Sequence, residues 1–135
     1  MTNEKLIRIL KKVELNKNEE VCDGIYHCFR IIKNKVFDGD GKYHYSKREY
    51  EFLVITEDKI KKAIILRIGD IDLHWLVLPK YRQKHVLSNA LRKGIISKLW
   101  PSIKSVTCCF DLYDEYDEKL SITNHLAEIS KLFVK

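Results

Sequence analysis

Three proton-accepting side chains alternate at the start of an apolar run in the middle of the chain. Asp70, Asp72 and His74 stand two residues apart, and Trp75-Leu-Val-Leu78 follows them directly. Because successive side chains of a strand point to opposite faces, these three would lie on one face. Carboxylate and imidazole groups serve as general bases, so Asp72 and His74 are candidates for proton transfer. The structural alternative places Asp70 in a turn and His74 in the core with a satisfied hydrogen bond.

A basic segment follows the apolar run and could bind an anion. Its charged side chains are Lys80, Arg82, Lys84, His85, Arg92 and Lys93. Such a cluster suits a phosphate-rich cofactor or nucleic acid, or it forms a solvated surface. Proteins bind single-stranded nucleic acid with aromatic side chains placed among basic ones, and in this segment Tyr81 alone fits. The sequence therefore disfavours nucleic acid as a partner.

Helical spacing dominates the first third of the chain. Residues 6–13 fit a short helix, although residues 6–9 could equally open a sheet. From residue 18 onward, one apolar stripe recurs at steps of three or four residues, formed by Val21, Ile25, Cys28, Phe29 and Ile32. This spacing predicts an amphipathic helix over residues 18–34, with a polar loop after it at residues 37–42.

The middle of the chain predicts three strands joined by short turns, at residues 50–56, 63–68 and 71–78. Links this short make them an antiparallel meander. Apolar residues at four-residue steps then predict a helix over residues 86–99. A fourth strand at residues 103–113 would be parallel to the third, because a whole helix separates the two. A last amphipathic helix is expected near residues 122–133.

Length and composition indicate one domain over residues 1–135. With 45% hydrophobic and 33% charged residues, the chain has the composition of an ordinary globular protein. No apolar run approaches the ~18–20 residues that cross a bilayer, and the start lacks a signal-peptide pattern. We therefore expect a cytoplasmic protein with no membrane partner. The four cysteines include no C-x-x-C pair, so no metal site is expected. The lack of an export signal and a reducing cytosol disfavour a disulfide.

This order of elements, with the segment from Trp75 to Leu91, resembles the GNAT acyltransferase family. In the family a strand ending in V-x-P-x-x-R leads into a helix, and Val77, Pro79 and Arg82 match that motif. The resemblance covers about residues 50–130 and implies an α/β fold class. The expected architecture is a GNAT-like mixed sheet, in which an antiparallel meander precedes a parallel strand–helix–strand unit. It would be truncated at the C-terminus, since the family continues into two more strands.

The resemblance also implies that the loop after the third strand binds the pyrophosphate of acetyl-CoA. The residues that would contact acetyl-CoA are Val77, Leu78, Arg82, Gln83, Lys84, His85, Val86 and Leu87, with Asn124 at the start of the last helix. Backbone N–H groups would bind the phosphates, and the amide of Val77 or Leu78 would polarise the thioester. Glycines stand in the family where this chain has His85 and Leu87. We expect His85 to donate to a phosphate and Leu87 to crowd the loop.

The implied activity is direct transfer of an acetyl group from acetyl-CoA to a primary amine, on a small molecule or a protein. Asp72 or His74 would take the proton from the amine, and Tyr113 on the fourth strand is an alternative proton donor. A tyrosine at a strand end is also a common rim residue without a chemical role. The competing hypothesis is a non-catalytic binding or regulatory module with the same fold. Both hypotheses leave a homodimer open.

Overall fold

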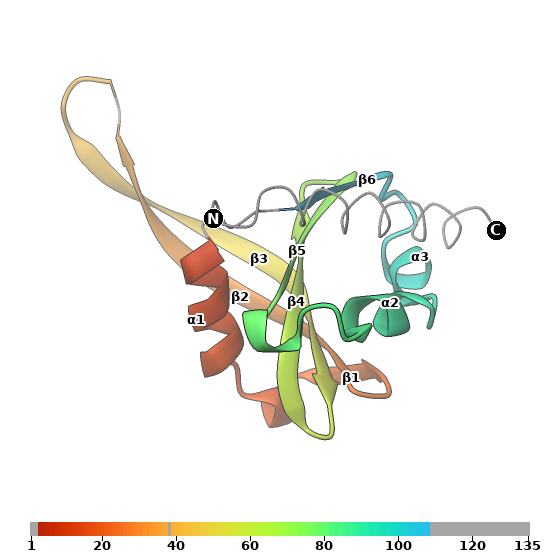
Figure 1. The fold of residues 1–135 in the computed structure, drawn as a ribbon. Coiled ribbons are helices and arrows are strands. Elements are labelled where there is room, and N and C mark those ends of the chain that lie inside the picture. The colour runs from red at the N-terminus through yellow and green to blue at the C-terminus, as the bar shows by residue number, and fades with distance from the viewer. Residues whose placement is uncertain (1–2, 38, 109–135) are drawn as a thin grey trace.

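The computed structural model describes residues 3–37 and 39–108. Within these residues the chain forms one six-stranded mixed sheet with helices on both faces (Figure 1). The strands are β1 (Glu19–Cys22), β2 (Ile25–Phe37), β3 (Tyr43–Glu57), β4 (Ile60–Ile68), β5 (Asp72–Val77) and β6 (Ser105–Cys108). The helices are α1 (Asn3–Lys12), α2 (Val86–Leu91) and α3 (Ile95–Leu99), with short 3-10 turns at Leu15–Lys17 and Pro79–Tyr81.

Strand order in the sheet follows the order along the chain, from β1 to β6. Each strand from β1 to β4 is antiparallel to the next, and β6 is parallel to β5. The parallel pair needs a crossover, which α2 and α3 supply. The predicted α/β class, the antiparallel meander and the parallel fourth strand are therefore confirmed. No helix in the described part of the chain is long and apolar enough to cross a membrane.

The helix predicted over residues 18–34 is wrong, since this segment forms β1, a turn at Gly24 and the first part of β2. Its apolar stripe combined two faces of a strand: Ile25 packs under α2 and α3, whereas Cys28 packs under α1. Gly24 has a φ of +77°, and a Cβ there would lie 2.7 Å from the backbone oxygen of Thr56. Aromatic and β-branched residues then favour the extended strand that follows.

The structure also decides the type of the first element and the lengths of the helix and strand predicted after residue 85. The ambiguous first element is the helix α1. The single helix expected over residues 86–99 is instead two short helices, because the chain turns at Gly94 with a φ of +70°. Of the expected fourth strand, residues 105–108 form β6. The remainder of that strand and the predicted last helix lie outside the described residues.

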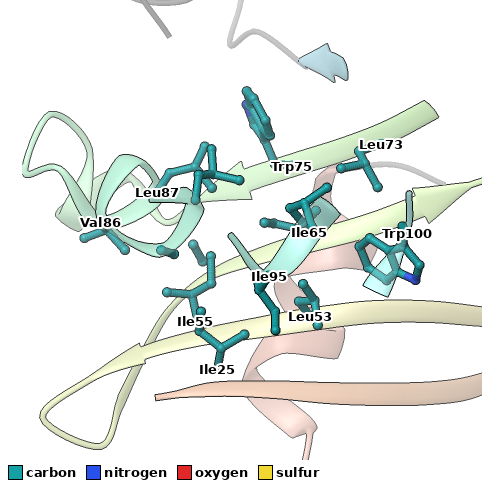
Figure 2. Close-up of a cluster of buried hydrophobic side chains, with 14 of the residues drawn as sticks. Ile25, Leu53, Ile55, Ile65, Leu73, Trp75, Val86, Leu87, Ile95 and Trp100 are labelled. Atoms are coloured by element: carbon teal, nitrogen blue, oxygen red, sulfur yellow. The ribbon is translucent and has the colours of Figure 1, made fainter. Parts of the chain in front are cut away.

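The core has two parts, one on each face of the sheet. On one face, α2 and α3 cover Leu53, Ile65 and Trp75, and the indole of Trp100 closes this cluster (Figure 2). On the other face, α1 covers Phe52 and its neighbours on β4 and β5. Strand side chains alternate between the faces, so β3, β4 and β5 contribute to both clusters.

The distal halves of β2 and β3 project from the body as a two-stranded ribbon (Figure 1). We call residues 30–49 the ribbon. Its cross-strand register runs without a break from Ile31↔Glu49 to Phe37↔Tyr43. Side chains of β3 from Tyr43 to Glu49 are all exposed, and so are most of those on the facing part of β2. The ribbon is therefore held by its own ladder and by its continuity with the sheet.

Candidate functional site

The predicted cofactor loop begins where β5 ends. Residues 80–85, the basic loop, start within the 3-10 turn that Pro79 opens. The amide of Tyr81 donates to the carbonyl of Leu78 at 2.8 Å, and Arg82 Nε donates to the carbonyl of Val77 at 3.2 Å. Arg82 is half-buried by this contact. The loop is thus fixed against the carboxyl end of β5, beside the point where the sheet changes from antiparallel to parallel.

Two residues of the basic loop have left-handed backbone conformations. Gln83 and His85 both have a φ of +60°, and neither is glycine. Such a conformation costs a non-glycine residue about 1–2 kcal/mol. His85 stands where the resemblance places a glycine, so the backbone keeps a glycine-type turn without the glycine. The side chains of Gln83, Lys84 and His85 are exposed.

Val86 and Leu87 face the opposite way from the exposed loop residues. Both are buried, at 3% and 4% exposure, within the cluster that α2 and α3 form on the sheet. Figure 2 shows Leu87 beside Trp75 in the same cluster of buried side chains as Ile65. The expectation that Leu87 crowds the loop is therefore wrong. Apolar side chains at these two positions anchor the loop to the sheet and leave its outer surface to polar groups.

The two backbone amides considered for the thioester differ in their surroundings. The amide of Leu78 donates to the carbonyl of Lys62 at 3.0 Å, so it belongs to the ladder with β4. Backbone groups of a strand alternate between its two edges, so the amide of Val77 is directed toward the β6 edge. Val77 is thus the better placed of the two for a ligand that lies along β5 on that edge.

Asp72 lies at the other end of β5, and His74 lies near the middle of the strand. Its six residues run from Asp72 to Val77. Five steps of about 3.3 Å therefore put roughly 17 Å between the first residue and the end that carries the loop. Asp72 and His74 share the α1 face, as their alternation predicted, because His74 meets Asn3 of α1. A ligand that reached from the loop to Asp72 would have to be long and extended, whereas His74 is three steps, or about 10 Å, from the end of β5.

His74 is buried at 5% exposure, with Nε2 3.4 Å from Oδ1 of Asn3. Burial lowers the pKa of His74, and the nearby carboxylate of Asp72 opposes that shift in part. The imidazole is therefore neutral at neutral pH, which is the form that accepts a proton. This placement also matches the structural alternative, a core histidine with a hydrogen bond. Its role as a general base stays a prediction.

A polar cluster that the sequence patterns did not reveal surrounds Glu51. His27 Nε2 lies 2.8 Å from Glu51 Oε1, and Trp100 Nε1 donates to the same oxygen at 2.6 Å. Arg67 Nη1 donates to the other carboxylate oxygen at 3.4 Å. Burial raises the pKa of Glu51, but the hydrogen bonds from Trp100 and His27 and the charges of His27 and Arg67 lower it overall.

This cluster joins four elements, because its members come from β2, β3, β4 and the end of α3. The sequence separations are large, and His27 fell within a segment predicted to be helical. One signal was present: a buried indole N–H needs an acceptor, so Trp100 required a polar partner. The side chains of Glu51 and His27 are 24% and 14% exposed, so the cluster borders solvent beside Phe29.

Two predicted site residues, Tyr113 and Asn124, lie outside the described residues. Among residues 3–37 and 39–108, no group of three or more His, Cys, Asp or Glu side chains could hold a metal ion. Cys28 is buried, and burial raises the pKa of its thiol to about 11. No protein-family model, curated protein or solved structure matches the chain.

Proposed function

We propose that this chain is an acyl-CoA-dependent N-acyltransferase with a GNAT-like arrangement, which transfers an acetyl group from acetyl-CoA to a primary amine. One observation carries the proposal: a basic loop with left-handed turns at Gln83 and His85 follows β5 where the sheet becomes parallel. In open α/β sheets, ligands bind beyond the carboxyl ends of strands where the strand arrangement changes. Strain at non-glycine residues is typical of such binding segments.

The residues of the loop fit a diphosphate. Successive backbone N–H groups in alternating conformations form a concave anion site. The cationic side chains of Arg82 and Lys84 and the exposed imidazole of His85 add charge and donors around it. Because Leu87 points into the core, no apolar side chain from that position covers the loop. Gln83 and Val86 would contribute backbone groups.

When bound, acetyl-CoA supplies an activated acyl group as a thioester. The amide of Val77 would polarise the thioester carbonyl, with Leu78 held in the ladder behind it. Asp72 or the neutral His74 would accept the proton of the attacking amine. Tyr113 as proton donor and Asn124 as a cofactor contact remain part of the proposal. The acceptor is a primary amine on a small molecule or a protein.

A second candidate function is a non-catalytic module that binds acyl-CoA, or a related anion, without transfer. The burial of His74 beneath α1 favours it, because a base that is 5% exposed has little access to an amine. Asp72 is half-buried at the edge of the same face. The two candidate functions share the loop and differ only in turnover.

Calorimetry of the full chain with acetyl-CoA tests the shared part. We expect binding heat and a higher melting temperature, both reduced in the variant Arg82→Gln/Lys84→Gln. The matched control is Lys11→Gln/Lys12→Gln, which removes two charges from the exposed last turn of α1. Absence of heat at millimolar acetyl-CoA would end the acyltransferase and the acyl-CoA-binding module, and leave only a module that binds a different anion. Release of CoA on addition of a panel of primary amines would then distinguish the enzyme from the module.

A further inference from the structure

The ribbon carries a large share of the positive charge of the chain. Residues 30–49 contain the six basic residues Arg30, Lys33, Lys35, Lys42, Lys47 and Arg48, and the three acidic residues Asp38, Asp40 and Glu49. The difference, 6 − 3, gives the ribbon a net charge of +3, half of the +6 of the whole chain. A thin projection with this charge attracts a polyanion and opposes contact with the same ribbon of a second copy.

Aromatic and basic side chains share one face of the ribbon. In the cross-strand register, Phe37 pairs with Tyr43, Lys35 with Tyr45, and Lys33 with Lys47. Directly paired residues lie on the same face, so this stretch presents three lysines and three aromatic rings without a carboxylate between them. The rings are exposed, with Phe37 at 55%, Tyr43 at 62% and Tyr45 at 61%.

The lysines lie close to the rings. Lys35 Nζ is 4.3 Å from the ring centroid of Tyr43, and Lys33 Nζ is 4.7 Å from that of Tyr45. The rings of Phe37 and Tyr43 are 5.1 Å apart and inclined at 60°. Each of these two lysine–tyrosine pairs thus combines an exposed flat ring with an ammonium group beside it. A nucleotide offers the two complementary features, a flat base and a charged phosphate.

We propose that this face of the ribbon binds single-stranded nucleic acid. Bases stack on Tyr43, Tyr45 and Phe37, and phosphates contact Lys33, Lys35 and Lys47. A duplex keeps its bases stacked inside and offers mainly phosphates to such a surface, so the exposed rings favour a single strand. Part of this interleaving is visible in the linear segment Lys42-Tyr-His-Tyr-Ser-Lys47, and the strand pairing adds Lys33, Lys35 and Phe37 to the same face. The proposal does not rest on acyl transfer.

Fluorescence anisotropy with labelled oligothymidylate and the full chain tests this proposal. We expect binding at low salt, weakened about tenfold or more by Tyr43→Ala/Tyr45→Ala, because each stacked base contributes substantially to affinity. The variant Lys33→Gln/Lys35→Gln should also bind more weakly. It should lower the slope of log affinity against log salt by about 1.4, since each phosphate contact on a single strand contributes about 0.7.

Two charge-matched controls locate the site. Lys11→Gln/Lys12→Gln on α1 should bind the oligonucleotide nearly as tightly as the unmodified chain. Lys80→Gln/Lys84→Gln removes two exposed charges from the basic loop and should do the same. Circular dichroism of each variant checks the fold, which these exposed substitutions should leave intact.

Three kinds of result would overturn the proposal. The first is absence of binding by the unmodified chain at low salt. The second is unchanged affinity in the tyrosine variant, or equal affinity for a duplex, since either shows that base stacking is not involved. The third is a change in oligomeric state on gel filtration when the tyrosines are removed, without loss of oligonucleotide binding. That outcome would mark the face as a contact between copies.

Discussion

Glu51 shows how a single carboxylate can organise residues that are distant in sequence. It accepts hydrogen bonds from Trp100 and Arg67 and lies within hydrogen-bond distance of His27. The Glu51 carboxylate accepts the hydrogen bond of the buried indole N–H of Trp100 at the edge of the core, and an unpaired N–H there would cost about 1–3 kcal/mol. Which carboxylate meets the indole depends on strand register and on the position of α3. The sequence can therefore predict that Trp100 needs an acceptor, but not which one.

Burial of His74 predicts that the stability of the fold depends on pH. Burial holds the pKa of His74 below its ordinary value of 6.5. Between these two pKa values, the imidazole is protonated in the unfolded chain and neutral in the folded chain. The contribution of neutral His74 to stability is therefore complete above about pH 6.5 and is lost as the pH falls through its folded pKa. We expect His74→Leu to reduce the acid sensitivity of the melting temperature below that pH. His85→Leu, at an exposed histidine, is the control and should leave the pH profile unchanged.

At the scale of elements, the sequence predicted an element correctly where the spacing of its apolar residues fits only one type of secondary structure. The strands β4 and β5 and the inner half of β3, from residue 50, were predicted because their apolar runs are continuous and their turns are short. Residues 43–49 of β3 were not predicted, because all their side chains are exposed and carry no apolar pattern. In β2, apolar residues occur on both faces at spacings that coincide with those of a helix, so its periodicity misled. The break between α2 and α3 at Gly94 lay within a continuous apolar pattern. The packing of the two helices against the sheet shows where the chain changes direction.

A substitution at the start of α2 tests how the basic loop is attached to the sheet. Leu87 and Val86 fix the start of α2 to the sheet, so Leu87→Ala should lower the free energy of unfolding by about 2–5 kcal/mol. The substitution should not strengthen acetyl-CoA binding, because the side chain points away from the outer surface of the loop. Asn89→Ala, at an exposed position of the same helix, is the control for urea denaturation. A gain in affinity without a loss of stability would restore the crowding hypothesis.

At the scale of the whole molecule, the ribbon and the rest of the described chain, which we call the body, are stabilised in different ways. The body is a three-layer arrangement in which both faces of the sheet are covered, and its buried clusters account for its stability. The ribbon is exposed on both faces and adds little to either cluster. An isolated two-stranded hairpin is marginally stable in water. The ribbon therefore depends on the body, whereas the body has little dependence on the ribbon.

This asymmetry predicts that the ribbon can be shortened without loss of the fold. The amide of Thr56 donates to Gly24, and ladder bonds alternate, so Ile32 and Arg48 form a hydrogen-bonded pair that an Asn-Gly turn can close. A variant with Asn-Gly in place of residues 33–47 should melt within a few degrees of the full chain and keep any heat of acetyl-CoA binding. It should lose oligonucleotide binding, because it lacks the tyrosines and lysines of the proposed face. Global unfolding of this variant would show that the ribbon supports the core, and retained oligonucleotide binding would place that site on the body.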